Sequence, residues 1–156
     1  MDGADPAPGP EAFFRQHWVT LAELVAAGEG ACREARPESG RLGGAIREAL
    51  ELQLRIEEEL CFPSLHSLHG GIADQVLDGV RRARSSLLEI LGHVEAAETK
   101  ELPGLWRSAR ERMKTYRDLE EQRLLPLLGS LPPVTLHEME LELEELLGKE
   151  GHLRRG

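Results

Sequence analysis

Two glutamate pairs in matching surroundings are the residues of this chain with the clearest chemical potential. Glu57-Glu58 lies in LQLRIEEELCFP (52–63), and Glu120-Glu121 lies in TYRDLEEQRLLP (115–126). In both copies an apolar pair and a proline follow, and the proline is expected to end the regular helical turn. The offset of 63 residues predicts two related helical hairpins. Paired with imidazoles, such carboxylates would be iron ligands.

The repeated segment resembles the motif of the hemerythrin-like, cation-binding helical bundle family, which reads His-x-x-x-Glu-Glu, an apolar pair and proline. The resemblance covers roughly residues 11–128. It implies an all-α, up-down-up-down four-helix bundle. The two histidine positions of the motif hold Gln53 and Tyr116 here. The chain therefore resembles the scaffold of a di-iron protein with many of its ligands replaced.

Three of the family's ligand positions survive, namely His17, Glu57 and Glu120, and the third helix has no histidine near Arg84. A dinuclear centre needs more inward ligands than these three. Two interpretations remain open. The three residues form a residual iron site, or the carboxylates are bonded to Gln53, Tyr116, His17 or an arginine in a structural polar network. Tyr116 would then fill the volume left by metal and imidazole.

The C-terminal run Gly151-His152-Leu153-Arg154-Arg155 resembles part of the short peptides that load cargo into encapsulin nanocompartments. The alternative is a solvated tail. The C-terminal run and the bundle with its lost metal ligands together make the chain similar to a hemerythrin-like cargo class of iron-storage encapsulins. That class binds flavin and reduces ferric iron. That resemblance implies FMN or another flavin as cofactor, iron as substrate, and the encapsulin shell protein as partner. It assigns no catalytic residue.

The sequence contains no Gly-rich phosphate-binding motif, so a flavin would have to sit between helices or at a dimer interface. Aromatic side chains would form its wall, and arginines would bind its phosphate. The candidates are Trp18, Trp106 and Tyr116 for the wall, and Arg81, Arg82 and Arg84 for the phosphate. The alternative is that each tryptophan is a core residue and that the basic run is a solvated helix face.

Apolar spacing and breakers predict helices over 10–27, 42–68, 72–98, 103–128 and 135–148. Gly28 and Gly30 are expected to end the first helix. The expected organisation is a mobile arm (1–10), a hemerythrin-like bundle (11–130), an amphipathic helix (131–149) and a tail (150–156). The amphipathic helix would pack across the bundle or form a dimer contact.

The net charge of −9 argues against general nucleic-acid binding. No segment is long and apolar enough to span a membrane, and no signal peptide is recognisable. Two cysteines without metal or redox spacing fit a reducing, cytoplasmic setting, and a homodimer is expected. Three functions remain open: a flavin-dependent ferric reductase, a residual iron-binding or iron-sensing domain, and a non-catalytic helical interaction module.

Overall fold

The structure, a computed structural model, describes residues 9–155, and side chains for residues 9–148. This part of the chain is all-helical and contains no strand. Its elements are α1 (Pro10–Arg33), α2 (Ser39–Arg55), η1 (Ile56–Cys61), α3 (Phe62–His69), α4 (Gly71–Ala96), η2 (Thr99–Glu101), α5 (Leu102–Leu119), η3 (Glu120–Leu124), α6 (Leu125–Gly129) and α7 (Pro133–Arg155). The expected arm (1–10) and tail (150–156) lie largely outside the described side chains.

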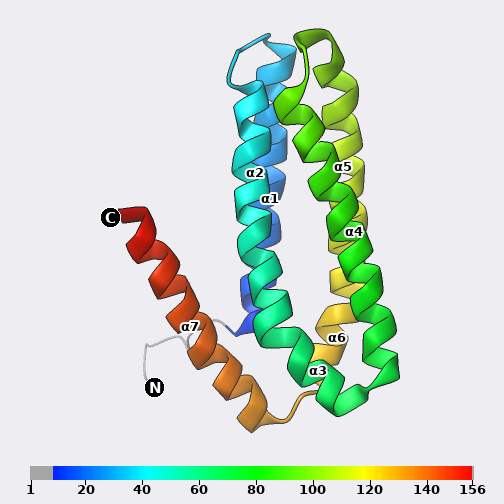
Figure 1. The fold of residues 1–156 in the computed structure, drawn as a ribbon, viewed down its shortest axis with the longest axis vertical. Coiled ribbons are helices and arrows are strands. Elements are labelled where there is room, and N and C mark those ends of the chain that lie inside the picture. The colour runs from blue at the N-terminus through cyan, green and yellow to red at the C-terminus, as the bar shows by residue number, and fades with distance from the viewer. Residues whose placement is uncertain (1–8, 156) are drawn as a thin grey trace, which may run out of the picture.

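Helices α1, α2, α4 and α5 lie side by side (Figure 1). Each of them packs against two of the others: α1 against α2 and α5, and α4 against α2 and α5. Apolar residues at helical spacing produce this packing, because they place one stripe of each helix toward the common core. The fully buried side chains of this core include Phe14, Leu21, Ile46, Leu50, Ile56, Leu65, Leu87, Leu91, Trp106 and Leu124.

The first helix is longer than its glycines predicted. It continues through Gly28 and Gly30 to Arg33, so the expectation that these glycines end it was wrong. Gly28 instead allows a close contact between α1 and α5. A Cβ added at this position would lie 2.2 Å from Cη2 of Trp106, so only glycine lets the indole lie against the α1 backbone.

Both copies of the repeated Glu-Glu segment form a π-helical turn. The first turn is η1 and the second is η3, and the α-helix resumes after each of them at α3 and α6. Pro63 and Pro126 stand in the first turns of these resumed helices. A proline lacks the N–H that an uninterrupted helix needs, and a wider turn before it absorbs the change in bonding register. The prolines therefore shift the helix instead of ending it.

The last helix, α7, leaves the other helices at an angle (Figure 1). Its Met139 and Leu143 are buried, and the helix contacts α1 and η1. The first half of α7 therefore packs against its own chain, which was one of the two alternatives expected for this helix. The other alternative, a dimer contact, stays a prediction. No described helix combines the length and the apolar character needed to cross a membrane.

Candidate functional site

Five polar side chains meet in the interior between the packed helices. They are Gln53 from α2, Glu57 from η1, Arg84 from α4, Tyr116 from α5 and Glu120 from η3, and all five are buried. Buried polar groups are costly unless they are bonded to one another. The hydrogen bonds among these side chains therefore decide what the site can do.

Tyr116 lies at the centre of this network. Its hydroxyl donates to Glu57, with 2.8 Å to Oε2, and accepts from Nε2 of Gln53 at 3.0 Å. Gln53 also donates to Oε1 of Glu120 at 2.6 Å. Gln53 and Tyr116 occupy equivalent positions of the repeat, 63 residues apart, and so do Glu57 and Glu120. The two copies of the motif thus face each other across the core, and the expected polar network is present.

Arg84 supplies the positive charge of the network. Its Nη1 donates to Oε2 of Glu57 at 3.1 Å, and its Nη2 donates to Oε2 of Glu58 at 2.8 Å. Arg81 then holds Glu58 from the surface side at 2.7 and 2.8 Å. Glu58 is half-buried and is held by these two arginines, whereas the equivalent Glu121 of the second copy is exposed.

An arginine was expected as one possible partner of the carboxylates but was not identified as Arg84, although the signal was present. Val80, Leu87 and Leu91 are buried on α4, and Arg84 falls in the same stripe, four residues after Val80 and three before Leu87. A cation in an apolar stripe requires an internal acid. Glu57 is that acid.

The network reaches α1 at two neighbouring residues. Nε1 of Trp18 donates to Oε1 of Glu120 at 2.7 Å. Nδ1 of His17 bonds to Oε1 of Gln53, and its ring stacks on Phe13 at a centroid distance of 5.0 Å. The amide of Gln53 and the ring of Phe13 therefore orient His17.

The two buried carboxyl groups differ in protonation. Burial, joined by the neighbouring charge of Glu57, holds the pKa of Glu120 well above its usual range. Burial also raises the pKa of Glu57, but the hydrogen bond from Glu120 and the charge of Arg84 oppose that rise. We therefore place the proton on Glu120 and the negative charge on Glu57. Burial also raises the pKa of Tyr116 well above its usual range, so the phenol stays protonated.

These residues do not fit the di-iron centre that the family resemblance implies. The Arg84 guanidinium lies against the carboxylate of Glu57, and the Tyr116 side chain fills the space between Glu57 and Gln53. Among the described residues, no group of three or more His, Cys, Asp or Glu side chains is arranged to hold a metal ion. The surviving positions His17, Glu57 and Glu120 are close in the fold but serve the hydrogen-bond network.

The six residues suggested for flavin binding are not brought together. Arg84 and Tyr116 belong to the buried network, and Trp106 is buried with its Nε1 donating to Oγ of Ser39 at 2.8 Å. The remaining arginines lie elsewhere on α4: the guanidinium of Arg81 lies over the Phe62 ring at 5.0 Å, and Arg82 is exposed. Of the six, Trp18 lines the groove described next.

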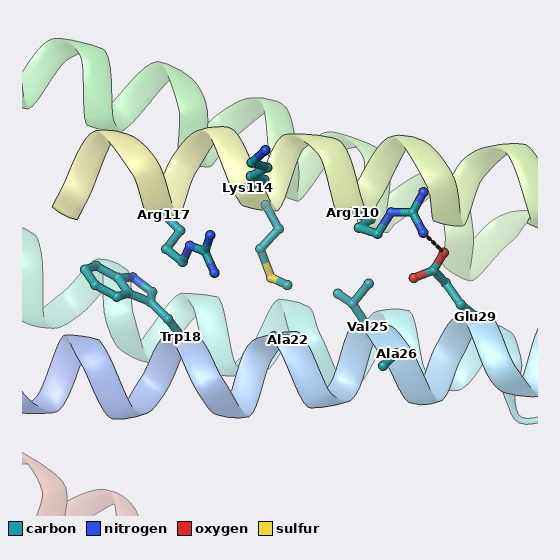
Figure 2. A pocket seen from close by; sticks show the side chains of 9 residues that line it. Trp18, Ala22, Val25, Ala26, Glu29, Arg110, Lys114 and Arg117 are labelled. Carbon is teal, nitrogen blue, oxygen red and sulfur yellow. Dashed lines mark hydrogen bonds and ion pairs between the residues drawn. The ribbon is translucent and has the colours of Figure 1, made fainter. Parts of the chain in front are cut away.

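A groove of about 280 Å³ runs between α1 and α5 (Figure 2). Its walls are largely apolar, with the indole of Trp18 at one end, and Val25 and Met113 are among the lining residues. Three cations from α5, Arg110, Lys114 and Arg117, line its α5 side. An ion pair of 3.0 Å between Arg110 and Glu29 bridges the two helices. The groove therefore combines an aromatic and aliphatic wall with a positive edge.

Sequence reasoning missed this groove, although both of its sides carry a pattern. Arg110, Lys114 and Arg117 recur at spacings of four and three residues, which puts them on one face of α5. Ala22 and Ala26 recur at a spacing of four on α1, and their small side chains leave the space open. These three cations are not adjacent in the sequence and so form no basic run.

Comparison with known proteins adds no relative. No protein-family model, no curated protein and no solved structure matches the chain significantly.

Proposed function

We propose that this protein is a hemerythrin-like, up-down-up-down four-helix bundle that has replaced its metal centre with a polar network and binds a flavin in the groove between α1 and α5. In this proposal the protein is a flavin-dependent ferric reductase. The single observation that carries it is the groove itself, where an indole, aliphatic side chains and three cations line one space. Pockets with apolar walls and a few placed charges are typical of cofactor sites.

The groove residues match the chemistry of a flavin mononucleotide. Trp18, Val25 and Met113 offer an apolar and aromatic wall for a flat ring system, and Trp18 is held by its bond to Glu120. Lys114 and Arg117 offer charge to a phosphate. Arg110 is exposed but is paired with the largely buried side chain of Glu29, so Lys114 and Arg117 are the cations assigned to the phosphate.

A bound flavin supplies the electron chemistry that side chains lack. The overall reaction would oxidise one nicotinamide-type donor, which gives up a hydride, and reduce two ferric ions to ferrous ions. One proton is released. Iron is then a substrate and not a resident cofactor, in agreement with a core whose carboxylates are held by Arg84, Gln53 and Tyr116.

Association with an encapsulin shell is part of the same proposal and rests on the sequence of residues 151–155. The side chains of that segment lie outside those that the structure describes. Copurification with the shell protein tests it, and deletion of residues 150–156 should abolish copurification. A shell that retains the truncated chain would contradict this part alone.

Titration of FMN, followed by its fluorescence, tests the groove. Lys114→Glu should weaken FMN binding at least about tenfold, because it reverses one charge at the phosphate. Ala22→Phe should also weaken it, since the larger ring fills the groove. Riboflavin, which lacks the phosphate, should be almost insensitive to Lys114→Glu.

Arg82→Glu is the matched control, because it makes the same change of charge at an exposed position of α4. It should leave FMN binding unchanged. Equal losses in Lys114→Glu and Arg82→Glu would move the site away from the groove, and a wild-type protein that binds no FMN would refute the proposal.

A second candidate function, a non-catalytic helical interaction module, is favoured by α7. This helix leaves the other helices at an angle (Figure 1), and its Leu141 is exposed. A wild-type protein that binds neither FMN nor iron would favour this alternative.

A further inference from the structure

A second groove adjoins the flavin groove along α1 and α5. It has a volume of about 290 Å³, and Arg33 in the last turn of α1 and Arg107 of α5 line it. Glu29 and Arg110 line both grooves, and their ion pair of 3.0 Å marks the boundary between the two spaces (Figure 2). A ligand in the second groove would therefore be the neighbour of a ligand in the flavin groove.

The second groove carries more positive charge than its own acid can balance. Three arginines line it together with one acid, Glu29, and Glu29 is already paired with Arg110. Among the side chains of residues 9–148, Arg33 and Arg107 have no ion pair and no hydrogen bond. Acidic residues outnumber basic ones in this chain, 28 to 19, so a shortage of acids does not explain two unpaired arginines at one groove.

This arrangement of charge favours an anionic ligand. Arg107 and Arg110 are three residues apart on one face of α5, where like charges repel, and Arg33 adds a third positive charge from α1. An anion in the groove would offset this repulsion and would offer acceptor oxygens to the unpaired guanidinium groups. Phosphate suits them best, because a guanidinium can donate two parallel hydrogen bonds to its oxygens.

We propose that the second groove binds the diphosphate of the nicotinamide-type electron donor, with Arg33 and Arg107 as the residues that bind it. The identity of the donor rests on the proposed function, whereas the choice of the two arginines rests on the second groove alone. A nicotinamide dinucleotide carries negative charge on the diphosphate that joins its two nucleosides. The donor would then lie beside the flavin, which hydride transfer between the two molecules requires.

Calorimetric titration of the flavin-free protein with NAD⁺ tests the inference, because the oxidised donor carries the same diphosphate and cannot react. Arg33→Gln and Arg107→Gln should each weaken NAD⁺ binding at least about fivefold, since each removes a charge-assisted hydrogen bond. Arg82→Gln is the matched control, because it makes the same change at an exposed position of α4, and it should bind NAD⁺ as wild type does. Arg33 and Arg107 are exposed, so these variants should keep the helical circular dichroism of wild type.

Two kinds of result would overturn the inference. The first is a wild-type protein that binds no NAD⁺, or Arg33→Gln and Arg107→Gln proteins that bind NAD⁺ as tightly as wild type. The second comes from ADP, which carries a diphosphate without nicotinamide. Binding of ADP that depends on Arg107, without binding of NAD⁺, would assign the groove to another nucleotide.

Titration of the same variants with FMN separates this inference from the proposed function. Arg33→Gln and Arg107→Gln should bind FMN as wild type does, because neither residue lines the flavin groove. FMN binding that depends on Lys114, together with NAD⁺ binding that does not depend on Arg107, would overturn the second site alone. NAD⁺ binding that depends on Arg107, in a protein that binds no FMN, would support the second site and refute the flavin proposal.

Discussion

Glu57 and Glu120 occupy equivalent positions of the repeat, yet their surroundings give the two carboxyl groups different protonation states. Glu57 accepts from the guanidinium of Arg84 and the hydroxyl of Tyr116, so it holds the charge. Glu120 accepts from an indole and an amide, which are neutral donors, and it keeps a proton. The difference comes from Arg84 on a third helix, and not from the motif itself.

Substitution of Glu120 tests this assignment. In the folded protein the pKa of Glu120 lies well above its usual 4.5, so the folded state binds more protons than the unfolded state at higher pH. Stability from this group is therefore full below about pH 4.5 and falls as pH rises toward the folded pKa. Glu120→Gln imitates the protonated acid, so it should raise the free energy of unfolding at pH 8 by about 1 kcal/mol or more and flatten its pH profile.

Glu57→Gln is the comparison variant and should behave in the opposite way. It leaves the buried Arg84 with only Glu58 as an acid partner, so it should destabilise the protein by about 3 kcal/mol at neutral pH. Urea unfolding of both variants between pH 5 and 8 gives the answer, over roughly the range where buried carboxyls titrate. Equal effects of the two substitutions would contradict the assignment of proton and charge.

At the scale of elements, periodicity predicted the main helices well. The expected spans 42–68, 72–98 and 103–128 correspond to α2 to α3, α4, and α5 to α6. Apolar residues repeat along each of them, and this signal is local. The end of α1 was not predictable, because it depends on a residue far away in the sequence. The π turns were not predictable, because they depend on a hydrogen-bond register that composition does not encode.

Gly28 illustrates why the end of α1 could not be predicted from the sequence. A glycine at this position suggests the end of a helix. In the structure, Gly28 lies within the helix and leaves room for the ring of Trp106 from α5. Gly28→Ala should therefore destabilise the protein by about 1–3 kcal/mol through overpacking, despite the better helix propensity of alanine. Thermal or urea unfolding measures the change.

Gly79→Ala in α4 is the matched control for that substitution. A Cβ at Gly79 meets nothing within 4 Å, so alanine should stabilise the helix by up to about 1 kcal/mol. A Gly28→Ala variant as stable as Gly79→Ala would show that the Trp106 contact relaxes freely.

At the scale of the whole molecule, the site could be predicted only in part. The network of Gln53, Glu57, Tyr116 and Glu120 followed from the repeat, since equivalent positions of two hairpins meet in the core. The role of Arg84 and the groove did not follow, because both arise where helices from different parts of the chain meet. Trp18 connects the two regions, since it lines the groove and donates to Glu120.

The groove is also a local exception in the charge of the molecule. The chain has a net charge of −9, yet Arg110, Lys114 and Arg117 line the groove together with one acid, Glu29. This local positive charge is the reason that the proposed flavin phosphate is placed between α1 and α5.

The most direct test of the account is the visible absorption spectrum of the purified protein, with total iron measured on the same sample. The account predicts the absorption bands of a bound flavin, present on purification or after incubation with FMN, and no stoichiometric iron. Stoichiometric iron without flavin would contradict it and return His17, Glu57 and Glu120 to the role of ligands. A protein that stays colourless after incubation with FMN would also contradict it.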